Sequence, residues 1–237
     1  GQLERDVDRL VRNDRIAWGA SMIACKDADA MVTGNIRHYA ASIEKLKKVT
    51  DPRPGEEIFG MTMITLKGKT ILVADTNVQD FPSPERLVKV SKSCVRVARL
   101  FGFDPKVAFL SHSTFGKPIS KNTKHVRDAI DLLKRENVDF DFDGEMQPDV
   151  ALNPIYQDIY PFSKIVGNAN ILIMPALHSA AISTKLMKVF GGGKLIGPLL
   201  IGLGSPIEVA PLRATTSEIL NLASIAAYSS DVIDYSN

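Results

Sequence analysis

Short apolar segments alternate with helical segments along this chain of 237 residues, and the alternation limits the folds open to it. In the second half, apolar runs at 107–110 and 171–174 are each followed by a segment with helical spacing, at 121–136 and 179–190. Strands joined by helices run parallel, because a helical crossover returns the chain to the same edge of the sheet. The sequence therefore predicts an α/β fold with mostly parallel sheets and helices on both faces.

Cap and turn residues support the same reading. Apolar runs at 61–66 and 70–74 flank Lys67-Gly68-Lys69, which predicts a β-hairpin. Ser83-Pro84 predicts the start of a long helix, and Thr215 or Thr216 caps a final helix that we expect to end near residue 228.

The segment most suggestive of a binding site follows the strand predicted at 107–110. Ser111, Ser113 and Thr114 supply hydroxyls, Gly116 lets a backbone approach closely, and Lys117 supplies an ammonium. Such groups at the carboxyl end of a parallel strand bind anions such as phosphate. A polar loop whose hydroxyls only cap the next helix has the same composition, so both readings stay open here.

Three other patterns favour structural explanations. The glycines of 191–194 lack the spacing of a nucleotide-binding loop, and we interpret them as a helix end. Carboxylates alternate along 139–145, which indicates an exposed edge strand more than a metal site. The four histidines show no ligand spacing, and His112 is expected on the surface of its loop.

Charge and cysteine content exclude several classes of partner. With 29 basic and 27 acidic residues the net charge is +2, so we expect neither nucleic acid nor an anionic membrane as partner. No apolar run is long enough to span a bilayer. Cys25 and Cys94 stand in unrelated contexts, and we interpret both as reduced packing residues of a cytoplasmic protein.

Several segments, taken in order, resemble the phosphate acetyl/butyryltransferase family. They cover almost the whole chain, and the ordered set is specific although no single segment is decisive. The segments are DADAMVTG at 27–34, VADT at 73–76, PSPE at 82–85, AFLSHSTFG at 108–116, DGEMQ at 143–147, DVAL at 149–152, NANILIMP at 168–175 and IGPLL at 196–200.

The resemblance implies a two-lobed α/β/α fold of the isocitrate/isopropylmalate dehydrogenase type, with an active site in the cleft between the lobes. We expect residues 1–104 and 200–237 in the first lobe and residues 105–199 in the second. Family members extend by roughly a quarter to a third of a domain before the position aligned with Gly1. The first lobe is therefore expected to be incomplete, with the N-terminal part of the domain missing.

In active members, a Ser-Arg pair and a downstream Asp follow the Gly-Pro segment. The resemblance implies that the Asp activates the thiol of CoA, while Ser and Arg polarise the acyl carbonyl and hold phosphate. This chain has Pro211 and Leu212 at the Ser-Arg positions and Glu218 at the Asp position. Since losing one oxyanion donor costs about 10²–10³ in rate, we expect acyl transfer to be lost.

These departures, together with Arg37-His38-Tyr39 and Tyr160-Pro161-Phe162, resemble malic enzymes that carry a phosphotransacetylase-like C-terminal domain. In those proteins a part absent from this sequence decarboxylates malate oxidatively to pyruvate, with NADP or NAD and a divalent metal. The appended domain binds acetyl-CoA and feeds back on that reaction. The resemblance thus implies a regulatory domain that binds acetyl-CoA or CoA and acts on its own malic enzyme domain, in a homodimer within a larger homo-oligomer.

Under this hypothesis no residue of the chain is catalytic and none ligates a metal. The expected ligand contacts are Ser111, Ser113, Thr114, Gly116 and Lys117 in one lobe, and Arg213 and Glu218 in the other. One alternative is an active phosphate acetyl- or butyryltransferase, in which Glu218 is the base and Arg213 replaces the lost arginine. Another is a domain that only builds the oligomer and binds no CoA ester.

Overall fold

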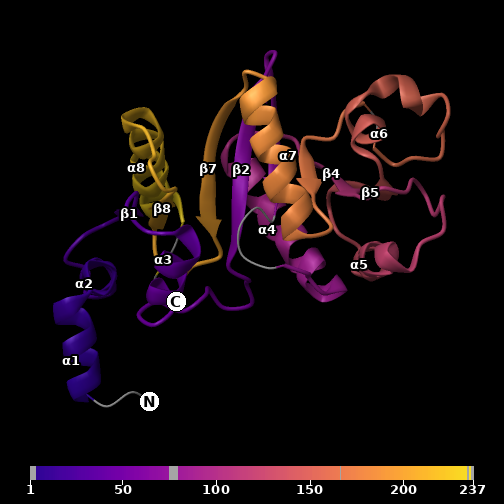
Figure 1. The fold of residues 1–237 in the computed structure, drawn as a ribbon. Coiled ribbons are helices and arrows are strands. Elements are labelled where there is room, and N and C mark those ends of the chain that lie inside the picture. Colours follow the sequence, from indigo (N-terminus) through magenta and orange to yellow (C-terminus); the bar gives the residue numbers. More distant parts are fainter. Residues whose placement is uncertain (1–3, 75–79, 166, 234, 236–237) are drawn as a thin grey trace. The chain divides into compact units, whose positions relative to one another are not determined.

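The computed structural model describes residues 4–74, 80–165, 167–233 and 235 (Figure 1). The chain separates into two compact units, which we call unit 1 (Gly1–Ile58 with Ile196–Asn237) and unit 2 (Phe59–Leu195). The residues Asp75 and Thr76 of the VADT segment lie outside the described part of the chain.

This division differs from the expected lobes at one boundary. We expected residues 59–104 in the first lobe, but they belong to unit 2. The reason is long-range pairing within unit 2, where β3 (Lys69–Ala74) pairs with β6 (Ile171–Ile173) and α4 (Pro84–Leu100) packs against α5 (Lys124–Arg135). The other boundary lies at 195–196, close to the expected 199–200.

Unit 2 is built on a mostly parallel sheet, as predicted. Its other strands are β2 (Phe59–Leu66), β4 (Lys106–Leu110) and β5 (Asp141–Met146), and the order is β5-β4-β6-β3-β2. All neighbours in this order are parallel except β2 and β3, which form the predicted antiparallel hairpin. Lys67 and Gly68 make its two-residue turn with φ of 51° and 76°, which suits the twist of the strands.

Helices cover both faces of this sheet. On one face, Val73, Ala108 and Leu110 pack with Ala151 of α6 (Pro148–Leu152) and Ala180 of α7 (Leu177–Phe190). On the other, α4 contacts β3 and β6, and α5 contacts β4 and β5. The short 3₁₀ helices of the unit are η1 (Lys121–Thr123) and η2 (Pro154–Gln157). The side chains of β4 and β6 alternate between two apolar layers, which is why these strands read as continuous hydrophobic runs.

Unit 1 is smaller and centres on a pair of parallel strands. The strands are β1 (Met31–Gly34) and β8 (Ile207–Ala210), and β7 (Lys194–Ile201) crosses from unit 2 into unit 1. The helices are α1 (Glu4–Asn13), α2 (Arg15–Ala24), α3 (Tyr39–Leu46) and α8 (Thr216–Val232). Contacts of α2, α3 and α8 with the strand pair bury the residues of β8 and leave those of β1 half-buried.

Local signals fix the helix ends. Ser83 caps α4, with Pro84 in the first turn, and the hydroxyl of Thr215 caps α8, which runs four residues further than expected, to Val232. Helix α7 ends before the glycines, of which Gly192 has a positive φ of 62°. Cys94 is buried as expected, but Cys25 is exposed, because it lies just past the last buried turn of α2. Among the described residues, no helix is long and apolar enough to cross a membrane.

The close approach of β1 and β8 predicts a specific sensitivity at Gly34. Its φ is 105°, and a Cβ there would lie 2.3 Å from the carbonyl oxygen of Ala210. Gly34→Ala should lower the free energy of unfolding by about 3 kcal/mol or more, measured by urea denaturation. Gly55→Ala is the matched control, since Gly55 has φ of 77° with nothing within 4 Å, and should cost only about 1 kcal/mol. Equal losses in the two variants would contradict the close contact.

Candidate functional site

The predicted polar loop lies directly after β4, at the carboxyl edge of the parallel strands. Ser111, Ser113 and Thr114 are buried, Gly116 is half-buried and Lys117 is exposed. The backbone N–H of Ser111 donates to the carbonyl of Met146 at the end of β5, at 2.9 Å. The loop is therefore anchored at the sheet edge where ligands bind in open α/β folds.

A tight turn forms the tip of this loop. Thr114 and Lys117 exchange two backbone hydrogen bonds, at 2.9 and 3.1 Å. The two residues between them, Phe115 and Gly116, have φ of 48° and 85°, and positive φ at both central positions is what a type I′ turn requires. Glycine adopts this conformation readily, whereas phenylalanine does so at a cost in backbone strain.

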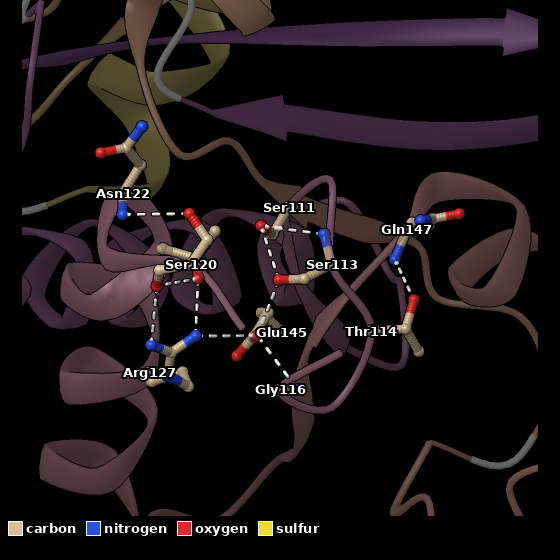
Figure 2. A network of polar contacts seen from close by, with 10 residues as sticks. Ser111, Ser113, Thr114, Gly116, Ser120, Asn122, Arg127, Glu145 and Gln147 are labelled. Atoms are coloured by element: carbon tan, nitrogen blue, oxygen red, sulfur yellow. Dashed lines mark hydrogen bonds and ion pairs between the residues drawn. The ribbon is translucent and has the colours of Figure 1, made fainter. Parts of the chain in front are cut away.

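The turn is held by one buried carboxylate, that of Glu145 on β5 (Figure 2). Its Oε1 accepts hydrogen bonds from Ser113 Oγ at 2.8 Å and from the backbone N–H of Gly116 at 3.1 Å. The same oxygen forms an ion pair with Arg127 Nη1 at 3.2 Å. The Glu145 side chain is only 1% exposed, so its charge depends on these three donors.

Arg127, on α5, is itself fixed by the segment that precedes its helix. Its Nη1 donates to Thr123 Oγ1 at 2.6 Å, and its Nη2 donates to the carbonyl of Ser120 at 3.0 Å (Figure 2). The guanidinium therefore links the loop after β4, the end of β5 and the start of α5. Planar guanidinium groups suit such bridging roles because their donors have fixed directions.

The acidic stretch was predicted as an exposed edge strand, and this was only half right. β5 does lie at the end of the strand order in unit 2. However, Asp143 and Glu145 are buried, and the register between β4 and β5 shifts so that Met146 rather than Glu145 pairs with Leu110. The irregularity falls at Glu145, whose carboxylate contacts the loop after β4.

This network decides which loop groups remain available to a ligand. The Ser113 hydroxyl and the Gly116 N–H, both predicted ligand contacts, donate to Glu145. Thr114 Oγ1 accepts from the N–H of Gln147 at 3.2 Å, which leaves its own proton free to be donated. Among the described residues, the Lys117 ammonium has no partner. Ser111 contributes a hydroxyl 3.3 Å from that of Ser113.

The remaining predicted contacts belong to unit 1, where local structure explains much of their geometry. The carboxylate of Glu218 accepts from the N–H and the hydroxyl of Thr215, at 2.8 and 3.0 Å, and completes the capping box of α8. Arg213 is exposed, with φ of 60°, and its N–H donates to the carbonyl of Asn35 at 3.0 Å. Leu212 is 48% exposed.

Unit 1 also contains a cavity of about 280 Å³ that the sequence did not reveal. It lies at the carboxyl ends of β1 and β8, with Gly34 and Ala210 in its wall beside Arg15, Asn35 and Arg37. The buried Oδ1 of Asn35 has no hydrogen-bond partner among the described residues. The side chains of the two arginines and of Asn35 add polar groups to a wall that is otherwise largely apolar. No motif spacing distinguishes these residues, because Arg15 opens α2, Asn35 and Arg37 follow β1, and Ala210 ends β8.

A buried carboxylic acid on β8, Glu208, was also not predicted from the sequence. Glu208 on β8 is 5% exposed, and its Oε2 accepts a hydrogen bond from the N–H of Leu200 at 2.9 Å. Burial raises the pKa of Glu208 to about 8, although the Leu200 N–H acts in the opposite direction. The group is therefore mostly protonated at neutral pH.

The chain is similar to a transferase family over most of its length and to part of several malic enzymes. A family model described as phosphate acetyl/butaryl transferase matches residues 1–227. The chain is 46% identical over 228 residues to an NADP-dependent malic enzyme of Rhizobium meliloti, and 36% identical over 236 residues to a probable NADP-dependent malic enzyme of Rickettsia prowazekii. These matches cover 96% and 95% of this chain but only 30% and 31% of the two relatives.

A comparison with solved structures points to the same family. A crystal structure of a phosphotransacetylase from Streptococcus pyogenes superposes with a TM-score of 0.89 and 28% identity. The match covers 96% of this chain and 70% of that chain. The α/β architecture expected from the sequence is thus confirmed.

The central role of Glu145 predicts that its charge stabilises unit 2. Glu145→Gln keeps the shape but weakens all three contacts at Oε1, and should lower the free energy of unfolding by about 1–3 kcal/mol. Asp131→Asn is the control on α5, because its ion pair with Lys134 is exposed and should contribute less than about 0.5 kcal/mol. Urea denaturation of both variants gives the comparison, and equal effects would remove the special role of Glu145.

Burial of Glu208 predicts a pH dependence of stability. The folded-state pKa of about 8 lies above the ordinary glutamate value of 4.5, so the stability present below pH 4.5 is lost as pH rises to about 8. The Glu208→Gln variant has no such titration. Its free energy of unfolding should therefore rise relative to that of the natural protein, by at most about 1.4 kcal/mol per pH unit across that window. Urea midpoints from pH 5 to 8 measure the difference, with exposed Asp6→Asn as control. Parallel profiles for the natural protein and Glu208→Gln would contradict the assignment.

Proposed function

Because this chain belongs to the phosphate acetyl/butaryl transferase family, and because it matches part of each malic enzyme, we propose that it is a regulatory domain of a malic enzyme. In this proposal the domain binds acetyl-CoA and has lost acyl transfer. The oxidative decarboxylation of malate, with its NADP and divalent metal, belongs to the part of those enzymes that lies outside this chain.

The observation that carries the proposal is the state of the positions where the family has its acyl-transfer groups. Pro211 and Leu212 stand there without a side-chain donor, and Leu212 is 48% exposed to solvent. Glu218, the counterpart of the base, has its carboxylate engaged in the cap of α8. The carboxylate thus serves to cap the helix and is not directed at a ligand by any contact of its own.

The loop of unit 2 supports binding rather than turnover. Glu145 occupies two of the donors that would otherwise be directed at an anion, Ser113 Oγ and Gly116 N–H. The Thr114 hydroxyl and the Lys117 ammonium remain, and together they suit a phosphate or a thioester carbonyl. With Ser113 and Gly116 engaged by Glu145, fewer fixed donors remain to stabilise a developing oxyanion.

Unit 1, taken by itself, also contains groups suited to an anion. The guanidinium groups of Arg15 and Arg37 line its cavity with the amide of Asn35. Arg37 is tied to Asp14 by an ion pair of 2.9 Å. Burial alone would raise the pKa of Asp14, but the hydrogen bonds from Arg37, Ile16 and Ala17 outweigh it and lower that pKa. The ion pair keeps Arg37 oriented at the cavity, where it can attract the phosphates of a CoA ester.

Regulation then follows from differential binding. A CoA ester that binds one arrangement of the protein better than another shifts their equilibrium, and effectors typically supply about 1–3 kcal/mol of such coupling. The partner that responds is the domain's own malic enzyme part, in a homodimer within a larger homo-oligomer. The competing function is an active phosphate acyltransferase, which the similarity to the Streptococcus pyogenes phosphotransacetylase favours.

The test supplies the full-length protein with acetyl phosphate and CoA, and monitors formation of the thioester by its absorbance. We expect no turnover, together with acetyl-CoA binding by calorimetry and a changed rate of malate oxidation. Thr114→Val with Lys117→Met should weaken acetyl-CoA binding about tenfold or more, because two contacts to an anionic ligand are lost. Lys121→Met, an exposed lysine four residues further along, is the control and should bind normally.

Turnover at an ordinary enzymatic rate, about 1–10³ s⁻¹, would refute the loss of acyl transfer. An unchanged affinity in the double variant would remove Thr114 and Lys117 from the site while leaving the sensor role intact. Absence of binding to any CoA ester would leave only a structural role.

A further inference from the structure

Three aromatic rings form a cluster next to the polar loop of unit 2. Phe115 lies at the tip of the turn, and Tyr160 and Phe162 come from the segment after η2. The ring centroid of Phe115 lies 5.3 Å from that of Tyr160 and 4.9 Å from that of Phe162. The centroids of Tyr160 and Phe162 are 6.0 Å apart. The interplanar angles of 55–80° correspond to tilted and edge-to-face contacts, which favour a fixed arrangement of the rings.

The cluster is only partly covered by protein. Phe115 packs against the core that contains Ala108 and Leu110, and Tyr160 is half-buried. Phe162, in contrast, is 65% exposed. Backbone hydrogen bonds from Tyr160 to Tyr156 and from Ser163 to Tyr160, at 2.9 and 3.0 Å, hold the segment on both sides of the exposed ring. A large aromatic surface is thus displayed on a supported backbone.

The position of Phe115 is unusual for an aromatic residue. Its φ of 48° is one that asparagine or glycine adopts readily in a type I′ turn, whereas a phenylalanine is strained there. The strain is retained by the hydrogen bond from its N–H to the carbonyl of Glu145, at 2.7 Å. Backbone strain of this kind gathers at binding sites, and here its result is to place a ring against Tyr160 and Phe162.

A positive charge lies in the same turn. Lys117 is two residues from Phe115, is exposed, and has no partner among the described residues. The Thr114 hydroxyl is also available at this turn, since its oxygen only accepts from Gln147. An open aromatic surface next to an unpaired ammonium and a hydroxyl matches a ligand that joins a flat base to phosphate groups.

We propose that Phe115, Tyr160 and Phe162 form a stacking subsite for the adenine ring of the CoA ester, with Lys117 neutralising a phosphate of the same nucleotide. This inference rests on the proposed function and assigns one end of the ligand to unit 2. The competing occupant is a protein surface, because Ile155 and Ile159 on the same segment are 66% and 61% exposed.

The experiment measures binding of acetyl-CoA and of adenosine 3′,5′-bisphosphate to the full-length protein by calorimetry. Phe162→Ala should weaken both ligands by roughly fivefold to a hundredfold, the range that stacking of a base on an aromatic side chain supports. Phe162→Trp should retain the affinity, because indole also stacks. Ile159→Ala is the matched control, since it removes exposed apolar surface from the same segment without removing a ring, and should leave both affinities unchanged.

The remaining outcomes separate the two claims. If the natural protein binds acetyl-CoA and Phe162→Ala binds it equally well, the stacking subsite is refuted while the sensor role stands. Weaker binding of acetyl-CoA but not of the bisphosphate would refute the assignment to adenine. An equal loss in Ile159→Ala, or a changed sedimentation coefficient in Phe162→Ala, would identify a protein interface instead. If the natural protein binds no CoA ester, the proposed function fails and this inference fails with it.

Discussion

A single buried negative charge organises the functional end of unit 2. A carboxylate with 1% exposure must be paired, and Glu145 meets this requirement with donors from the loop after β4 and from α5. That requirement explains why the turn at Phe115 and Gly116, the Ser113 hydroxyl and the Arg127 guanidinium are all directed at this carboxylate. The groups left for a ligand are those the carboxylate does not use.

Much of the architecture could be predicted from the sequence because its determinants are local. Strand and helix periodicity, the Lys67-Gly68 hairpin and the Ser83 and Thr215 caps depend on neighbouring residues, and each is found in the structure. The boundary between the units was misplaced because it depends on β3 pairing with β6, about a hundred residues apart, and pairing at that distance leaves no local signal.

The site was less predictable, for a different physical reason. Composition identifies a loop rich in donors, but it does not show which donors the protein uses itself. Glu145 looked like one member of an alternating exposed strand, whereas the structure buries both Asp143 and Glu145. The cavity beside Asn35 likewise depends on two strand ends that meet from opposite ends of the chain. The ordered resemblance identified the family, whereas the roles of individual groups needed coordinates.

The internal pairing at Glu145 also has a kinetic and entropic consequence. Because the loop is already closed around a negative group of the protein, its backbone is ordered before any ligand arrives. A ligand that contacts Thr114 and Lys117 would not have to order the loop's backbone, so less of its interaction energy is offset by lost flexibility. Association should then proceed as a single encounter with a preformed surface, without a slow folding step, which suits a sensor that follows changing metabolite levels.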